Sequence, residues 1–310
     1  MQPNCQQISI NLSEIQKLKA DFDAALKNGQ EDSDTTTSLN IFGQADAIQR
    51  ELEIRMPIFR EQLVPREFRQ LIEKEEKTLS QFFSPDKLVW VPKLPKSITL
   101  ELFRFWESIG FELHYLPQAG MTQEKTFPGW TEKLHKWFYE QIQEKDIAAD
   151  SATLKGEWVL VDGRSKPAYQ NGDQMYSNDP LAPILAKLRK KQSLFRDSAI
   201  QDYKHKGSRF NISYDELQSV PVKIALAKLL RTTPENLSLP RAIEWNFLGN
   251  AHHPEWGTTN TWELFQDKHI NGDCLNGGDF DYGGFSNVFV HSPSDHLDNQ
   301  GFRLMVRFPK

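Results

Sequence analysis

The most constraining feature of this 310-residue chain is the spacing of its glycines near the carboxyl end. Six of the 17 glycines fall between Gly272 and Gly301, and they include the pairs Gly277–Gly278 and Gly283–Gly284. Glycine supplies positive φ and close chain approach at a cost in local order, so this spacing favours a shaped loop framed by short strands. Such loops on a rigid frame commonly carry binding or catalytic side chains.

Composition and charge exclude several classes of protein. The net charge is −5 and the pI is near 5.9, which argues against a nucleic-acid partner, because nucleic-acid binding needs a basic surface. We find no apolar run near the ~20 residues of a membrane helix, so no membrane insertion is expected. Cys5 and Cys274 are the only cysteines and no secretory signal is visible. These features predict a cytoplasmic protein, with non-classical export as the alternative, and they leave the oligomeric state open.

The apolar pattern predicts an α+β chain in three parts. Apolar residues recur at helical spacing in five stretches: 13–28, 41–52, 68–79, 99–109 and 130–142. Runs typical of strands lie at 88–91, 111–116 and 158–161. A polar stretch at 146–156 is expected to be a linker. We therefore predict an N-terminal helix with a flexible segment (1–35), a small helical or α+β domain of undefined role (36–148) and a C-terminal domain (156–310).

Local signals mark the elements of the C-terminal domain. Ser213 with Glu216 forms a capping-box pattern that opens a helical stretch. Pro240 is expected in the first turn of a further helix, which Gly249 would close as a left-handed cap. From Phe302 to Phe308 apolar and other residues alternate, which predicts a half-buried strand. Within that strand Arg303 either bonds loop carbonyls or lies on a solvated face.

Several runs in this domain resemble segments of a known family. They are Leu239–Leu248, His253–Gly257, Asn260–Leu264, Leu275–Gly278 and Gly301–Arg303. In order and rough spacing, over about seventy residues, they are similar to the formylglycine-generating-enzyme (sulfatase-modifying factor) superfamily. The resemblance implies a C-type-lectin-like fold for 156–310. It also implies structural roles for Trp245, Trp256, Trp262, Gly277, Gly278, Gly301 and Arg303.

A second group with this fold, the variable proteins of diversity-generating retroelements, is closest in style. Their ligand-binding loop lies between the double glycine and the final Gly-Phe-Arg. Randomising the first two bases of AAY codons cannot produce Lys, Glu, Gln, Met or Trp. These types make up 79 of the 310 residues, yet none occurs from His269 to Asn299. The resemblance therefore implies a diversified loop, although a loop rich in Gly and Asn also avoids Lys and Glu.

The catalytic groups that the superfamily implies are absent. No cysteine pair follows the double glycine, and Cys274 stands alone before it. The iron-binding His-x3-His-x-Glu cluster of the sulfur-transferring relatives is missing, and His114 and His135 are isolated in sequence. His252–His253 could hold a metal with a third ligand from elsewhere, or could cap the preceding helix. We therefore expect no catalytic residues and no metal centre.

The expected ligand-binding face combines aromatic and small polar side chains, a mixture that suits adaptable recognition. It comprises Asp279, Phe280, Asp281, Tyr282, Phe285, Asn287, Phe289, His291, Ser292, Asp295 and His296. If Val288 and Val290 face inward by period two, Phe285, Asn287, Phe289 and His291 face outward, and the opposite parity would bury them. Asp279, Asp281, Asp295 and Asp298 could hold a structural calcium ion, but turn formation is the favoured explanation.

These expectations define a function. The chain is predicted to be a non-catalytic binding protein that presents a diversified loop to an unknown protein or cell-surface ligand, with no cofactor. The alternative is a metal-dependent enzyme of the formylglycine-generating superfamily with non-standard catalytic residues.

Overall fold

The computed structural model describes residues 17, 20, 64–84, 89–166, 168–169, 176, 178–194 and 206–308. By its internal contacts the chain divides into two units, Met1–Glu73 and Lys74–Lys310. The helices expected at 13–28 and 41–52 fall almost wholly outside the described residues. The fold is α+β, as expected. The described residues form two sheets.

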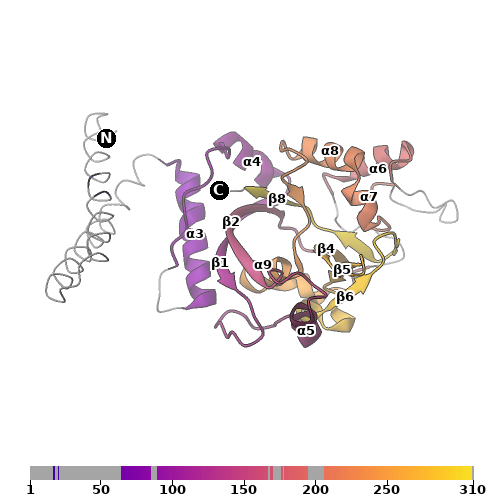
Figure 1. Cartoon of the computed structure of the whole chain (residues 1–310). Helices are drawn as coiled ribbons and strands as arrows, with labels where there is room; N and C mark the ends of the chain where they lie inside the picture. The colour runs from indigo at the N-terminus through magenta and orange to yellow at the C-terminus, as the bar shows by residue number, and fades with distance from the viewer. Residues whose placement is uncertain are drawn as a thin grey trace. The chain divides into compact units, whose positions relative to one another are not determined.

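Apart from the helix at Ala182–Lys190, which we did not predict, the described helices lie in stretches where apolar spacing or capping residues predict one (Figure 1). They are α3 (Arg66–Phe83), α4 (Leu100–Ser108), α5 (Lys136–Glu144), α6 (Ala182–Lys190), α7 (Tyr214–Gln218), α8 (Val220–Leu229) and α9 (Ala242–His252). Short 3-10 turns add η1 (Pro254–Thr258), η2 (Phe280–Tyr282) and η3 (Gly284–Ser286). The side chain of Thr99 caps α4 by accepting from Leu102 N at 3.2 Å. The predicted capping box of Ser213 and Glu216 is confirmed at α7.

The helix predicted from residue 130 begins later, at Lys136. The side chain of His135 caps it by accepting from Trp137 N at 3.2 Å. Trp130 lies in the preceding loop, where its Nε1 donates to Asn246 Oδ1 at 2.7 Å. The aromatic residue that suggested an earlier start is therefore buried by a tertiary contact.

The first sheet has the order β1-β2-β8-β3 and is antiparallel throughout. Its strands are β1 (Phe111–Gly120), β2 (Thr153–Asp162), β8 (Met305–Phe308) and β3 (Leu237–Ser238). β1 pairs with β2 from Phe111↔Asp162 to Gly120↔Thr153. This pairing joins segments that we expected in separate domains, on either side of a linker at 146–156. A polar stretch marks a loop, but its composition does not show which strands its flanks join.

The second sheet has the order β6-β5-β4-β7, and β4 runs parallel to β7. Its strands are β4 (Trp262–Lys268), β5 (Cys274–Gly277), β6 (Val288–His291) and β7 (Gln300–Phe302). The double glycine lies at the end of β5, and β6 follows the 3-10 turns. The expected loop framed by short strands is therefore present.

The single strand expected over 302–308 is wrong. Phe302 ends β7, Met305 begins β8, and the chain passes between the two sheets at Arg303 and Leu304. Arg303, Leu304, Met305 and Val306 are all buried. Alternation of apolar and polar residues predicts a strand with one solvent-exposed face. Here both faces are covered by other parts of the protein, so the alternation does not predict which side chains are exposed.

The strand expected at 88–91 is also absent over its described residues, 89–91. Side chains of α3 take the backbone donors that a neighbouring strand would have bonded. Val89 N donates to Ser80 Oγ at 2.9 Å, and Val91 N donates to Glu76 Oε1 at 3.3 Å. Side-chain acceptors can replace a ladder partner where an apolar segment packs on a helix.

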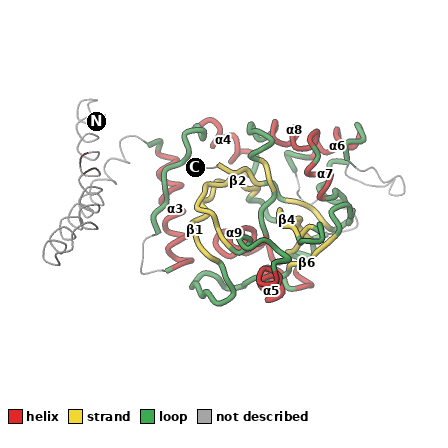
Figure 2. Tube along the Cα trace, in the orientation of Figure 1, coloured by secondary structure: helices red, strands yellow, loops and turns green. Residues whose placement is uncertain are grey.

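Helix α9 contacts β2 of the first sheet and both β4 and β5 of the second (Figures 1 and 2). Its residues from Ala242 to Gly249 are all buried, including the polar Glu244 and Asn246. Pro240 lies just before the N-cap residue, Arg241. The expected helix end at Gly249 is wrong, because α9 continues to His252. A Cβ at Gly249 would lie 2.0 Å from Phe285 Cε1, so this glycine makes room for a ring.

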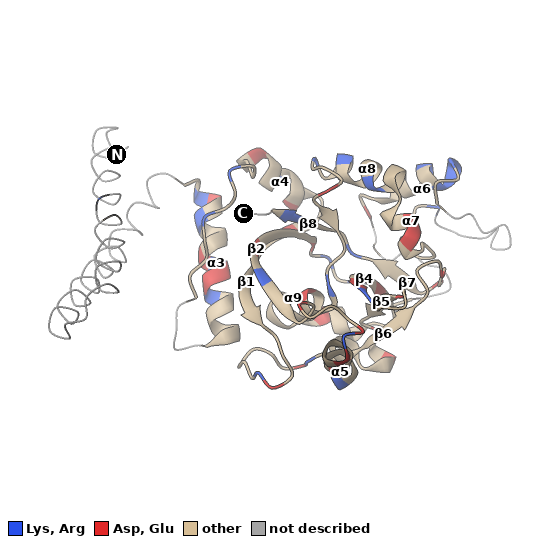
Figure 3. Cartoon of the chain, viewed as in Figure 1, with Lys and Arg blue, Asp and Glu red and all other residues tan. Residues whose placement is uncertain are grey.

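Charged residues of both signs are spread over the elements of Lys74–Lys310 (Figure 3). The last turn of α6 carries Lys187, Arg189 and Lys190, whose positive charges interact favourably with the negative end of the helix dipole. Among the residues that the structure describes, no helix is long and apolar enough to cross a membrane.

Candidate functional site

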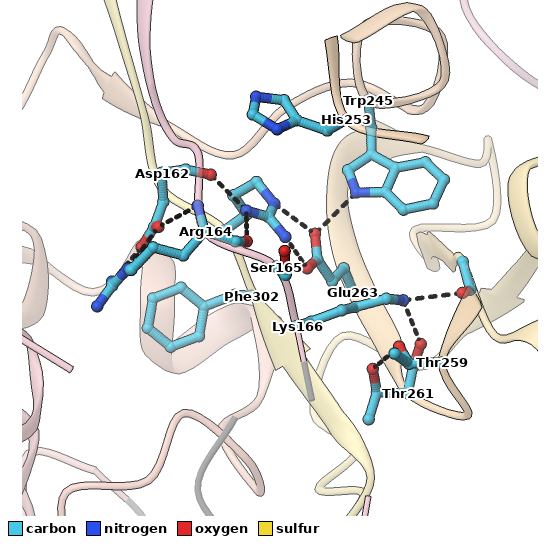
Figure 4. A network of polar contacts seen from close by, with 12 residues as sticks. Asp162, Arg164, Ser165, Lys166, Trp245, His253, Thr259, Thr261, Glu263 and Phe302 are labelled. Carbon is cyan, nitrogen blue, oxygen red and sulfur yellow. Dashed lines mark hydrogen bonds and ion pairs between the residues drawn. The ribbon is translucent and has the colours of Figure 1, made fainter. Parts of the chain in front are cut away.

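A buried ion-pair network holds the two sheets together below the glycine-framed loop (Figure 4). Arg303 is fully buried and donates to both carboxylate oxygens of Glu263, from Nη2 at 2.8 Å and from Nε at 3.0 Å. Its Nη1 donates to the carbonyls of Asp162 and of Arg164, the latter at 2.9 Å. The guanidinium lies 3.7 Å from the ring centroid of Trp256. Of the two roles left open for Arg303, the structure shows carbonyl bonding and no solvated face.

The double glycine is fixed to the same network. Trp245 Nε1 donates to Glu263 Oε2 at 2.8 Å. Lys166 Nζ donates to the carbonyls of Thr261 at 2.7 Å and Gly278 at 2.8 Å (Figure 4). Burial lowers the pKa of Lys166 to about 8. Gly278 has φ +92°, and a Cβ there would lie 2.8 Å from the Trp245 ring. The expected structural roles of Trp245 and Gly278 fit these contacts.

A second buried ion group continues from this network. Arg209 Nη2 donates to Asp162 Oδ2 at 2.7 Å, and Arg209 Nε donates to Asp179 Oδ2 at 2.6 Å. Burial alone would raise the pKa of Asp162, but the charges of Arg209 and Arg164 outweigh it and lower the pKa to about 2. The scaffold below the loop is therefore held by ion pairs with no water between the partners.

Four side chains of the expected binding face form a patch that we call the aromatic rim: Phe280, Tyr282, Phe289 and His291. Phe280, Tyr282 and Phe289 are 61%, 63% and 47% exposed, and His291 is half-buried. The Trp262 ring lies 5.2 Å from Tyr282, 5.5 Å from Phe289 and 6.0 Å from His291 between centroids. Trp262, for which a structural role was expected, is half-buried and contacts these three rings from β4.

Three members of the expected face are buried, which corrects the prediction for them. Phe285 is 6% exposed and packs over Gly249 and Gly257, with its centroid 5.2 Å from Trp245. Asn287 is buried and donates to Tyr282 O at 3.1 Å. Asp279 is buried and caps η2 by accepting from Asp281 N at 2.9 Å. The period-two argument fails for Phe285 and Asn287 because β6 begins only at Val288.

The remaining polar members lie at the surface with separate partners. Asp281 is exposed, and Ser292, Asp295 and His296 are half-buried. His296 Nε2 lies 3.0 Å from Glu216 Oε2, and Asp295 Oδ2 lies 3.9 Å from His291 Nδ1. Tyr169 donates to Asp298 Oδ2 at 2.8 Å. In the described ranges, the groups with metal-ligand spacing include none of the four aspartates considered for calcium.

A different set of side chains, distant in sequence, meets where the end of α9 reaches β1. This histidine cluster comprises Glu75, Glu112, His114, His252 and His253. Two groups with metal-ligand spacing share His114: one adds Glu75 and His252, and the other adds Glu112 and His253. Within each group the ligand atoms lie within 4.8 Å of one another. Glu75 and His114 are almost fully buried, whereas the Glu112 side chain is 41% exposed.

Carboxylates orient two of the imidazoles. His114 Nδ1 lies 3.1 Å from Glu75 Oε1, and His253 Nδ1 lies 3.3 Å from Glu255 Oε1. His253 also stacks on Trp256, with centroids 4.4 Å apart and an interplanar angle of 1°. The Nε2 atoms of His114, His252 and His253 are buried and have no hydrogen-bond partner among the described residues. Buried polar atoms without partners are rare and call for an explanation.

The cluster perturbs its own titration. Burial lowers the pKa of His253 to about 4 and that of His252 well below its usual value. For His114, burial also acts to lower the pKa, but Glu75 and Glu112 outweigh it and raise the pKa to about 9. Two neutral imidazoles thus lie beside one that is charged between two carboxylates.

In the sequence His114 is isolated, and His252–His253 could hold a metal only with a third ligand that the sequence does not identify. Neither glutamate was among the predicted site residues. One signal was available: Glu112 and His114 lie two apart on the predicted strand, and so share a face. Glu75 and His253 reach this face only through the packing of α3 and α9. Cys274, which stands alone in sequence, donates to His291 O at 3.4 Å, and burial raises its pKa to about 11. It is a protonated thiol, which does not favour a copper-thiolate role.

No family model, no curated protein and no solved structure matches this chain.

Proposed function

We propose that this protein binds a protein or cell-surface ligand through the aromatic rim, displayed on a rigid C-type-lectin-like scaffold. The observation that carries the proposal is the exposure of the rim. Among the described residues, four large aromatic side chains are exposed, and three of them are Phe280, Tyr282 and Phe289. Exposed aromatic groups gathered in one patch favour a binding surface.

The frame below the rim supports this proposal. The ion pairs of Arg303 and Glu263 and the ring packing of Trp245 and Phe285 are buried. The rim side chains project from η2 and β6, outside that packing. Substitutions at rim positions would therefore change the surface chemistry with little effect on the core. The absence of five residue types between His269 and Asn299 also fits a diversified segment of the retroelement kind.

The experiment replaces the rim residues Phe280, Tyr282, Phe289 and His291, together with Asp281, in a library and leaves the buried Phe285 and Asn287 unchanged. Variants would be tested against arrayed cell-surface proteins and glycans. We expect thermal transitions close to that of the parent chain and a partner set that follows the rim sequence. The control is Ile270→Ser, which removes an apolar side chain 74% exposed outside the rim. A partner set that is indifferent to the rim, or rim variants that fail to fold, would contradict the proposal.

The metal-dependent enzyme remains the second candidate function, and the histidine cluster is the observation that favours it. This candidate requires turnover as well as metal. Loss of turnover in cluster variants, with rim variants unaffected, would separate it from the binding function.

A further inference from the structure

We infer that His114, His253 and Glu112 form a binding site for one divalent transition-metal ion, with Glu75 and Glu255 orienting the imidazoles. This inference does not rest on the proposed binding function. The site lies where the end of α9 meets β1, and the aromatic rim contributes none of its ligands.

The ligand atoms are Nε2 of both histidines and Oε2 of Glu112. Glu112 Oε2 lies 3.5 Å from His114 Nε2 and 3.8 Å from His253 Nε2. The pair with His114 is not aligned as a hydrogen bond, and both Nε2 atoms are buried without one. The ligand atoms of these three residues lie within 4.8 Å of one another, at distances longer than hydrogen bonds, which leaves room for an ion that bonds all three.

The residues that hydrogen-bond to the proposed ligands match those found around metal sites in other proteins. A metal-bound histidine usually gives its other ring N–H to a carboxylate or carbonyl, which fixes the tautomer and the ring orientation. Glu75 does this for His114 at 3.1 Å, and Glu255 does it for His253 at 3.3 Å. Glu75 is itself held by Tyr115 N, which donates to its Oε2 at 3.1 Å. Stacking on Trp256 fixes the His253 plane.

The overlapping group of Glu75, His114 and His252 is the weaker assignment. His252 Nε2 lies 3.7 Å from Glu75 Oε2, but both carboxylate oxygens of Glu75 already have partners, His114 Nδ1 and Tyr115 N. The assigned ligand set keeps both contacts intact.

The donor set selects the class of ion. Two imidazoles and one carboxylate suit Zn²⁺ or Fe²⁺, whereas Ca²⁺ and Mg²⁺ prefer oxygen ligands. Three protein ligands leave coordination positions open, as in catalytic rather than closed structural sites. The exposed side of Glu112 gives an ion a route from solvent to the buried imidazoles.

The test first strips the full chain of metal with a chelator. The stripped protein is then titrated with Zn²⁺, with Co²⁺ and, under anaerobic conditions, with Fe²⁺. Calorimetry and elemental analysis would measure stoichiometry, and the visible absorption of Co²⁺ would report its ligands. We expect one ion per chain, a higher thermal midpoint when it is bound, and no comparable binding of Ca²⁺ or Mg²⁺. We expect Glu112→Gln and His253→Gln each to weaken binding at least 100-fold and to alter the Co²⁺ spectrum.

Two controls separate the site from its neighbours. His252→Gln, inside the cluster, and His291→Gln, in the rim, should each bind the ion within a few fold of the parent chain. Circular dichroism and thermal melting of every stripped variant establish that it is folded, and Glu112→Gln changes only a partly exposed side chain. The assignment is overturned if folded parent protein binds no stoichiometric ion, if Glu112→Gln and His253→Gln bind normally, or if only His252→Gln abolishes binding.

Discussion

Replacing Arg303 by methionine is the strongest test of the buried frame. The substitution keeps an unbranched apolar stem and removes the charged guanidinium group. Glu263 would keep only Trp245 Nε1 at 2.8 Å and the hydroxyl of Tyr176 at 3.5 Å. Breaking a buried ion pair by removing one partner costs about 3–5 kcal/mol. The carbonyls of Asp162 and Arg164 would also lose a donor, and a buried unsatisfied group costs about 1–3 kcal/mol. Because such effects overlap, we expect a total loss of about 4–6 kcal/mol.

The assay is urea unfolding followed by circular dichroism, with the slope checked for two-state behaviour. The matched control is Arg231→Met, which breaks an exposed ion pair with Glu101 at 3.1 Å and should cost less than about 1 kcal/mol. Arg303→Lys keeps the positive charge but cannot form the bidentate contact with Glu263. Its loss of unfolding free energy should lie between those of Arg303→Met and Arg231→Met.

A double-mutant cycle isolates the pair itself. Arg303→Met combined with Glu263→Gln should be less destabilised than the sum of the single variants by about 2 kcal/mol. The reasoning fails if Arg303→Met costs no more than Arg231→Met, or if the two substitutions add without coupling.

Two further predictions concern the glycine frame and the buried acids. Gly277→Ala should lower the thermal midpoint strongly in differential scanning calorimetry, because the new Cβ would lie 2.1 Å from Asn287 O. The control is Gly120→Ala, whose Cβ would have no neighbour within 4 Å and should leave the midpoint nearly unchanged. Equal effects of the two substitutions would refute the packing argument. Burial acts to raise the pKa of Glu244, but Arg307 and Arg241 outweigh it and lower the pKa from 4.5 to about 2, so the stabilisation is complete above pH 4.5 and is lost as pH falls toward 2. At 1.36 kcal/mol per pKa unit this contributes at most about 3 kcal/mol, and acid unfolding of Glu244→Gln should show a shallower dependence over that range.

The sequence alone determined the local elements whose signals lie within a few residues. The capping box of Ser213 and Glu216 and the apolar spacing of α3 and α4 required no distant partner, so those helices were predictable. The glycine pairs likewise predicted a framed loop, because the need for positive φ and close approach is local. Helix α5 begins later and α9 ends later than predicted, because Trp130 and Gly249 contact residues that are distant in sequence.

Only the tertiary structure determines which side chains lie close together in space and which are exposed. The exposure of Phe289 and the burial of Phe285 depend on where β6 begins and on the space above Gly249. Arg303 became a buried frame residue because the chain changes sheets there and both faces are covered. The histidine cluster draws His114 from β1, His253 from the end of α9 and Glu75 from α3, and no short-range pattern links residues so far apart. Conformational preference is a property of neighbours along the chain, whereas a binding site is a property of neighbours in space.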